Sequence, residues 1–362
     1  MTVSRTSQPP RAMIYGANGY TGRLIARHAV ERGLKPVLAG RNHQALMALS
    51  GELDCPAVSF GLHQPAQIAE QIKSFSVVLN CAGPFSRTAR PMIEACLSVG
   101  TDYLDITGEI DVIELAAARS ERAKQADVAL IPAVGFDVVP SDCLAALLAE
   151  RLPGAKVLQL AFSGTGGLSA GTAKTMLEAL PGGGRVRIDG EIRHVPIAWK
   201  TLEIPFRNKK QSGMTIPWGD VASAYYSTGI PNIEVYTTAP RKQIEWLRRV
   251  RFVLPMLAFR PLQSVGRRLI ERRIKGPSDA ERQLTRSLLW GRVSDDRGKS
   301  VSANLETASG YQLTALTAVA ALERALARQV PRGFSTASQA FGKDFILSFP
   351  DTEIFWELQT DA

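Results

Sequence analysis

A glycine-rich turn near the N-terminus places the strongest constraint on the fold of this 362-residue chain. The segment Gly16-Ala-Asn-Gly-Tyr-Thr-Gly22 follows the apolar run 12–15 and precedes a helix-like stretch at 23–32. Glycines permit a tight turn between a strand and a helix, and the helix then points its free amide donors at a phosphate. The GxxGxxG spacing is a weak signal alone, but the strand, turn and helix around it predict the first unit of a dinucleotide-binding fold.

Strand-like and helix-like segments alternate through the rest of the N-terminal third, which predicts a doubly wound, Rossmann-type parallel sheet. The predicted strands are 12–15, 36–40, 57–60, 77–81, 103–106 and 128–131, and the later helices are 65–75, 91–99 and 110–125. Ligands of such sheets lie outside the carboxyl ends of the strands. We therefore expect three turns, 81–85, 107–109 and 135–137, to surround the nicotinamide of the dinucleotide.

The end of the second predicted strand indicates which dinucleotide is bound. Arg41-Asn42 occupies the place where an NAD site usually carries a carboxylate for the ribose 2′-hydroxyl. A guanidinium can pair with a 2′-phosphate through two charge-assisted hydrogen bonds, whereas a carboxylate would repel it. The sequence thus predicts NADP(H). The alternative, in which Arg41 only caps or solvates the strand end, stays open.

The pattern changes near residue 141, where a second, α+β domain with a mostly antiparallel sheet is expected. Ser141-Asp142 resembles the cap of a helix that continues through 145–152. Further strands are expected at 155–163, 185–189, 230–236 and on both sides of an Asp295-Asp-Arg-Gly298 turn, with helices at 172–180 and 311–328. The antiparallel sheet could supply a homodimer interface.

The excess positive charge lies in one segment. Residues 241–275 hold eleven basic and two acidic residues, which accounts for the whole net charge of +9. Leu262, Val265, Leu269 and Ile274 recur near helical spacing, so an amphipathic basic helix is predicted. Its arginines are either simply solvated or form a dock, Arg241–Lys275, for an acyl carrier protein or an anionic lipid surface. No aromatic-interleaved motif accompanies them, so nucleic acid is not an expected partner.

Composition gives no sign of export or of a metal site. The first eleven residues are polar, and the apolar run 252–259 is too short to span a bilayer. The four cysteines, at 55, 81, 96 and 143, form no CxxC pair, and the four histidines show no metal-ligand spacing. A cytoplasmic protein with reduced thiols and no metal is expected.

Five motifs together resemble the saccharopine dehydrogenase-like reductases, and within them the branch of trans-acting enoyl reductases of polyketide lipid assembly. The motifs are Gly16-Ala-Asn-Gly-Tyr-Thr-Gly22, Ala39-Gly-Arg-Asn42, Val78-Leu-Asn-Cys-Ala-Gly-Pro-Phe85, Tyr103-Leu-Asp-Ile-Thr-Gly-Glu109 and Gly135-Phe-Asp-Val-Val-Pro-Ser-Asp142. They occur in the order and spacing of that family. A looser match extends through 168–172, 276–278 and 342–345, so the resemblance covers most of the chain.

The resemblance implies an N-terminal cofactor domain and an inserted substrate domain. We expect a disordered lead-in at 1–11, an NADP-binding Rossmann domain at 12–140, a substrate or dimerisation domain at 141–308, and a C-terminal helix and tail at 309–362 that return to the Rossmann domain. Two sets of residues are implied to bind the dinucleotide. The adenosine and phosphates would be held by Gly16, Asn18, Gly19, Tyr20, Thr21, Gly22, Arg41 and Asn42, and the groove would be lined by Cys81, Ala82, Gly83 and Pro84. Gly135 and Phe136, in the third turn, complete the predicted cofactor site.

An absent motif narrows the chemistry. Short-chain dehydrogenases need Tyr-x-x-x-Lys to protonate a carbonyl oxygen, and no tyrosine of this chain has a lysine four positions later. Conjugate reduction of an enoyl thioester demands a weaker acid, because hydrogen-bond donors can stabilise the enolate until the α-carbon is protonated. The motifs therefore favour reduction of a carbon–carbon double bond in a hydrophobic or carrier-bound acyl substrate.

Asp137 and Glu109 are the candidate catalytic residues, because both carboxyl groups fall in turns expected to face the cofactor. In the alternative interpretation, Asp137 only bonds local amides and Glu109 caps the helix that starts near Ile110. Cys81 is not expected to be a nucleophile, since no histidine or base motif accompanies it. Two other functions stay open: an imine reductase of the saccharopine type, and a noncatalytic NADP-binding protein that docks on an anionic partner or membrane.

Overall fold

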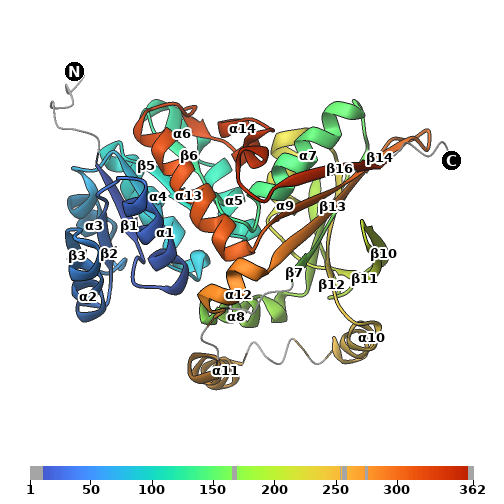
Figure 1. Cartoon of the computed structure of the whole chain (residues 1–362), viewed down its shortest axis with the longest axis horizontal. Helices are drawn as coiled ribbons and strands as arrows, with labels where there is room; N and C mark the ends of the chain where they lie inside the picture. The colour runs from blue at the N-terminus through green and yellow to red at the C-terminus, as the bar shows by residue number, and fades with distance from the viewer. Residues whose placement is uncertain (1–10, 165–168, 253, 255–258, 274–275, 358–362) are drawn as a thin grey trace.

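The structure is a computed structural model, and it describes residues 11–164, 169–252, 254, 259–273 and 276–357. The chain forms two sheets with helices packed around each (Figure 1). The predicted fold class, a Rossmann-type parallel sheet followed by an α+β domain, is confirmed. Nearly all of the expected lead-in lies outside the described residues, as do Ile274 and Lys275 of the predicted basic helix.

The first sheet has seven parallel strands in the order β15-β6-β5-β4-β1-β2-β3. Its strands are β1 (Ala12–Tyr15), β2 (Val37–Gly40), β3 (Ala57–Ser59), β4 (Val77–Asn80), β5 (Asp102–Asp105), β6 (Ala129–Ile131) and β15 (Gly333–Phe334). Successive residues of β1 enter opposite cores: Ile14 belongs to the same core as Ile25, and Met13 to the same core as Met92. Burial on both faces explains why β1, β2 and β6 are continuous apolar runs.

Helices cover both faces of this sheet. The apolar cores place α1 (Tyr20–Glu31) and α2 (His43–Leu53) on one face, and α3 (Pro65–Ile72), α4 (Phe85–Val99) and α6 (Ser120–Gln125) on the other. The helix α5 (Ile110–Ala117) contributes side chains to both cores. The helix predicted at 110–125 is thus two helices. α4 begins at Phe85, not at 91, because burial of Phe85 and Ala89 outweighs the one backbone hydrogen bond that Pro91 cannot make.

The second sheet follows the order β10-β11-β12-β7-β13-β14-β16, and β8 and β9 extend from β12. Its strands are β7 (Val157–Gly164), β8 (Gly184–Ile188), β9 (Glu191–Val195), β10 (Thr201–Phe206), β11 (Lys209–Thr215), β12 (Asn232–Thr238), β13 (Arg286–Ser294), β14 (Ser300–Ala308) and β16 (Glu353–Glu357). Among the described strands of this second sheet, only β7 and β12 pair in parallel. Apolar side chains of α7 (Val139–Arg151) and α9 (Asp220–Thr228) share one core with this sheet.

The C-terminal segment, expected to return to the Rossmann domain, divides between the two sheets. α13 (Gly310–Leu326) packs beside α1, and β15 adds a seventh strand to the parallel sheet. β16 instead pairs with β14 in the second sheet. The remaining helices are α8 (Ala170–Ala179), α10 (Arg241–Val250), α11 (Arg260–Arg273), α12 (Asp279–Leu284) and α14 (Ala337–Phe341). None of the described helices combines the length and apolar character needed to cross a bilayer.

The expected cap at Ser141-Asp142 is wrong, because α7 already begins at Val139. Asp142 is fully buried and its two carboxylate oxygens accept hydrogen bonds from the Ser227 hydroxyl and the Ser338 amide, both at 2.7 Å. This carboxylate joins α7 to α9 and α14. Its partners lie 85 and 196 positions away, so no local pattern could have indicated them.

Candidate dinucleotide and substrate site

The glycine-rich turn brings three strand ends together. Gly16 has a φ of +82°, and a Cβ atom placed there would lie 2.8 Å from the backbone nitrogen of Ala82 after β4. A Cβ at Gly22 would lie 2.2 Å from the Gly16 oxygen, and one at Gly40 would lie 2.8 Å from Asn18 Oδ1. Only glycines permit these approaches. The predicted cofactor residues of the first, second and fourth strands therefore meet at one point.

The N-terminus of α1 suits a pyrophosphate. Gly19 precedes the helix and supplies no side-chain cap, and the first turn carries no acidic residue. The first amides of α1 and its positive dipole end are thus available to an anion. A hollow of about 220 Å³ opens beside this turn and is lined by Asn18, Gly19, Tyr20, Arg23, Leu24, Arg27, Pro277 and Arg282.

Tyr20 holds a distant segment over the glycine-rich turn. Its hydroxyl donates to the Pro277 carbonyl oxygen at 2.5 Å and accepts from Arg282 Nη1 at 2.8 Å. A Cβ at Gly276 would lie 2.8 Å from the Tyr20 ring, and Tyr311 packs edge-on against that ring with centroids 5.0 Å apart. Tyr20 therefore positions residues 276–282 beside the predicted phosphate site, a role that the sequence did not indicate.

Arg41 and Asn42 leave β2 at the edge expected for the adenosine. Arg41 is exposed, and its positive charge acts near Tyr15, where burial raises the pKa of the phenol to about 12 in spite of this charge. Asn42 Oδ1 accepts from the Ala45 amide at 3.1 Å and so caps α2. Arg41 thus stands free of the strand ladder with its guanidinium at the surface, as contact with a 2′-phosphate requires.

The turn after β4 is held by Asn80, which is not among the predicted site residues. Asn80 is fully buried; its Oδ1 accepts from the Ala82 amide at 3.1 Å, and its Nδ2 donates to Thr88 Oγ1 at 3.3 Å. These bonds set the path of Cys81, Ala82, Gly83 and Pro84. Burial raises the pKa of the Cys81 thiol well above its ordinary value, which agrees with a packing role for this residue.

Glu109 caps a different helix from the one expected. Its carboxylate accepts from the backbone amides of Phe85 at 2.7 Å and Ser86 at 2.8 Å, which are the first amides of α4. Although Glu109 occupies the N-cap position of α5, it makes no capping hydrogen bond there. The Glu109 carboxylate therefore connects turn 107–109 to turn 81–85. The interpretation of Glu109 as a cap of its own helix, α5, was wrong.

Asp137 lies directly against the second turn. A Cβ at Gly108 would lie 2.9 Å from Asp137 Oδ2, so this glycine makes room for the carboxyl group. Burial and then the negative charge of Glu109 raise the pKa of Asp137 to about 7. The structure thus brings the two predicted catalytic carboxyl groups together. Asp137 exists in both protonation states near neutral pH, as a proton donor must.

The third turn is anchored from outside the first sheet. The Phe136 amide donates to Thr314 Oγ1 of α13 at 3.0 Å, and a Cβ at Gly135 would lie 3.0 Å from the Thr314 methyl group. The Asp137 carbonyl oxygen accepts from Trp218 Nε1 at 2.5 Å. Trp218 comes from the second domain and packs on Phe162 with ring centroids 4.7 Å apart. Trp218 is a site residue that no motif indicated.

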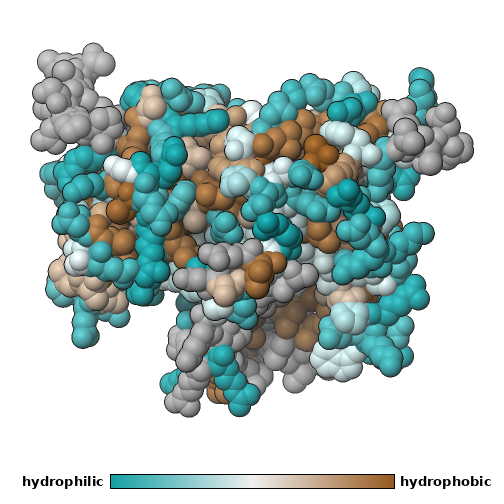
Figure 2. Space-filling model, viewed as in Figure 1, coloured by the Kyte–Doolittle hydropathy of each residue, from teal (hydrophilic) through white to brown (hydrophobic). Residues whose placement is uncertain are grey.

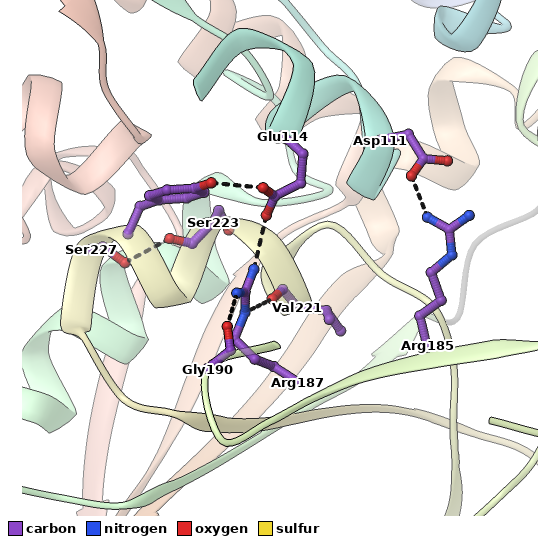
Figure 3. Close-up of polar contacts among 9 residues, drawn as sticks. Asp111, Glu114, Arg185, Arg187, Gly190, Val221, Ser223 and Ser227 are labelled. Atoms are coloured by element: carbon purple, nitrogen blue, oxygen red, sulfur yellow. Dashed lines mark hydrogen bonds and ion pairs between the residues drawn. The ribbon is translucent and has the colours of Figure 1, made fainter. Parts of the chain in front are cut away.

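A buried arginine fixes α5, and with it the second turn, to the second domain (Figure 3). The side chain of Arg187 on β8 donates to the Val221 and Gly190 carbonyl oxygens and to Glu114 Oε1, at 2.7 to 2.8 Å. The Tyr226 hydroxyl donates to the other oxygen of Glu114 at 2.7 Å. These contacts hold Glu109, at the start of α5, in a fixed relation to the loop that carries Trp218.

Two further buried acids lie near the site. Asp105 ends β5, and its Oδ1 accepts from the amides of Thr107 and Ala133 at 3.0 and 2.8 Å. Burial raises its pKa to about 6. Burial also raises the pKa of Asp220, at the start of α9, well above its ordinary value. Across the described ranges, no group of three or more His, Cys, Asp or Glu side chains is arranged to hold a metal ion.

A parallel sheet with a glycine-rich first turn, an uncapped helix start and an arginine after the second strand defines a dinucleotide-binding protein of the Rossmann type. Residues 12–131 match the saccharopine dehydrogenase NADP binding domain. Over this third of the chain the sequence is similar to that domain, and the cofactor is NADP(H). The predicted resemblance is confirmed.

Two curated relatives each match part of the chain. A trans-acting enoyl reductase of Mycobacterium ulcerans is 35% identical over 141 residues, covering 36% of this chain and 33% of the relative. A saccharopine dehydrogenase-like oxidoreductase of Bos taurus is 29% identical over 160 residues, covering 39% and 37%. Each match thus spans about a third of the length of the relative.

The overall fold is similar to that of a solved structure. The apo, L-Glu-forming saccharopine dehydrogenase of Saccharomyces cerevisiae aligns with a TM-score of 0.65 at 10% identity, covering 96% of this chain and 100% of that chain. The second domain is therefore included in the structural likeness.

Proposed function

We propose that the chain is an NADPH-dependent reductase that reduces a carbon–carbon double bond in a hydrophobic, unsaturated acyl or polyketide-type substrate. The observation that carries this proposal is Asp137, a carboxyl group with a pKa of about 7 in a turn at the carboxyl edge of the NADP-binding sheet. The matches to trans-acting enoyl reductases support the same reaction class.

The reduced nicotinamide, when bound, supplies hydride to the β-carbon of the substrate. The chain's own residues then have three tasks. The glycine-rich turn and α1 bind the phosphates, and Arg41 selects the phosphorylated ribose. The neutral carboxyl of Asp137 donates its proton to the α-carbon of the resulting enolate, and Glu109 keeps that proton on Asp137 through its negative charge.

A thiol nucleophile is not part of this proposal, because burial raises the pKa of the Cys81 thiol far above neutrality.

A saccharopine-type imine reduction is the main alternative reaction. Its amino-acid substrate carries a carboxylate, and the Asp137 and Glu109 carboxyl groups at the proposed reaction centre would disfavour a second anion there. A hydrophobic acyl thioester carries no such charge.

The test is NADPH oxidation by the full chain with a medium-chain trans-2-enoyl thioester, compared with an amine plus an aldehyde. Turnover of the thioester alone supports the proposal, and turnover of amine plus aldehyde alone replaces it with imine reduction. Asp137→Asn should lower kcat by about 100-fold while NADPH binding is retained. Asp296→Asn, in an exposed turn, is the matched control and should behave as the parent chain. Tight NADPH binding with turnover of neither substrate would indicate a noncatalytic protein.

A further inference from the structure

Large exposed apolar side chains concentrate in one part of the molecule. Seven of the nine found among the described residues lie between 176 and 284, on α8, α10, α11 and α12 or beside them: Met176, Trp246, Phe252, Phe259, Val265, Leu269 and Leu284. Trp246, Phe252 and Phe259 are 61, 78 and 64% exposed. Aromatic side chains exposed to this degree cost free energy in water, so a partner for them is expected.

Basic side chains surround these apolar groups. On α10, Ile244 is buried and anchors the helix, while Lys242, Arg248 and Arg249 are exposed. No ion pair is seen for these three cations within the described part of the chain. Arg268 and Arg273 are likewise exposed on α11. Figure 2 shows hydrophilic residues covering much of the lower right, where α10 lies, and in Figure 1 both helices project from the same side of the molecule.

We propose that this surface, formed by α10, α11, Phe252 and Phe259, docks on an anionic phospholipid bilayer. In a bilayer, basic side chains contact the lipid phosphates while Trp and Phe side chains enter the region between the headgroups and the acyl chains. A bilayer can also accept apolar side chains that are spread over two separate helices. An acidic carrier protein would need the cations but offers no broad apolar phase for exposed aromatic residues. The combination of charge and dispersed aromatic side chains therefore favours lipid.

The docking surface is connected to the NADP site through α8. Gly266 of α11 lies against α8, since a Cβ there would lie 2.6 Å from Leu177 Cδ2. Two residues earlier on α8, Thr175 Oγ1 lies 4.0 Å from the Cβ position of Gly83, in the turn after β4. A bilayer bound by α11 would thus sit beside the site. This geometry would bring an acyl substrate from the lipid phase to the NADP site. That consequence rests on the proposed function, but docking on the bilayer is independent of it.

Flotation of the full chain with vesicles tests docking without any turnover. We expect binding to vesicles of phosphatidylcholine with 30% phosphatidylglycerol, on the order of the anionic content that attracts basic segments, and little binding to phosphatidylcholine alone. Arg248→Glu with Arg249→Glu should weaken binding by about 30-fold or more, because each surface cation is worth about 1 kcal/mol. Trp246→Ser with Phe252→Ser should also weaken binding by about tenfold or more.

Matched controls lie elsewhere on the surface. Arg297→Glu with Lys299→Glu makes the same change in net charge in the exposed β13–β14 turn, and Met47→Ser removes an exposed apolar side chain from α2. Both should bind vesicles as the parent chain does. Failure to bind anionic vesicles would overturn the proposal. Equal losses of vesicle binding in the control and test variants would also overturn it. Undiminished vesicle binding by the Trp246 and Phe252 variant would overturn it as well, and would indicate an electrostatic docking surface for an acidic protein. Docking without enoyl reduction would refute only the proposed function.

Discussion

The indole Nε1 of Trp218 donates a 2.5 Å hydrogen bond to the main-chain oxygen of Asp137, across 81 positions of sequence. The bond connects the loop before α9 to the third turn of the parallel sheet. A second-domain side chain thereby holds the backbone of the proposed proton donor. The position of the Asp137 carboxyl group depends on how the two domains pack.

Trp218→Phe tests this connection. The substitution keeps an aromatic ring for packing on Phe162 but removes the donor, so Asp137 should be held less firmly. We expect the free energy of unfolding to fall by about 1 kcal/mol and kcat for the enoyl substrate to fall, with the NADPH dissociation constant unchanged. Steady-state kinetics measures kcat, and cofactor titration measures the NADPH dissociation constant. Trp199→Phe, in the connection between β9 and β10, should change none of these three quantities.

The raised pKa of Asp137 predicts the pH dependence of both activity and stability. If the neutral carboxyl donates the proton, kcat should fall as the pH rises through about 7. The folded chain holds this proton more tightly than the unfolded chain does. The stability contributed by the neutral carboxyl is therefore fully present below pH about 4 and is lost as the pH rises through about 7. Asp137→Asn should abolish this component, so denaturation at pH 8 should show the variant to be more stable than the parent chain.

Glu109→Gln separates capping from electrostatics. The amide loses the charge-assisted bonds to Phe85 and Ser86, which should cost about 1 to 3 kcal/mol of unfolding free energy. It also removes the negative charge that raises the pKa of Asp137. The descending limb of the kcat–pH profile should therefore move to lower pH. An unmoved limb would contradict the proposed coupling, and Glu70→Gln, on the surface of α3, should leave the profile unchanged.

Gly16→Ala and Gly33→Ala form a matched pair. Both glycines have a φ of +82°, so both substitutions bring the same backbone strain, about 1 to 2 kcal/mol. An added Cβ has open space at Gly33 but lies 2.8 Å from the Ala82 nitrogen at Gly16. We expect Gly33→Ala to retain NADPH binding and Gly16→Ala to lose it. Equal affinities, measured by titration, would show that contact between the two turns does not shape the site.

Arg41→Ala should erase the preference for the phosphorylated cofactor. Loss of charge-assisted bonds to the 2′-phosphate should weaken NADPH binding by about 10- to 100-fold and leave NADH binding nearly unchanged. Lys35→Ala, which removes an exposed cation at the other end of β2, is the control. If the parent chain binds NADPH and NADH equally, the role given to Arg41 is wrong.

Sequence alone determined the parallel sheet, its glycine-rich turn and the identity of the cofactor. Each of these depends on neighbouring residues: an apolar strand, glycines where the backbone turns, and a helix that begins within a few positions. Arg41 could be proposed as the contact of the 2′-phosphate because it directly follows β2. The positions of Glu109 and Asp137 in turns at the carboxyl edge followed from the same order of strands.

Only the tertiary structure decided what those carboxyl groups do. The partners of Glu109 belong to α4, 23 and 24 positions away, and Trp218 reaches Asp137 from the second domain. β15 completes the sheet from the far end of the chain. The pKa of Asp137 near 7 arises from loss of water and from the nearby charge of Glu109, and both exist only after distant segments have packed together.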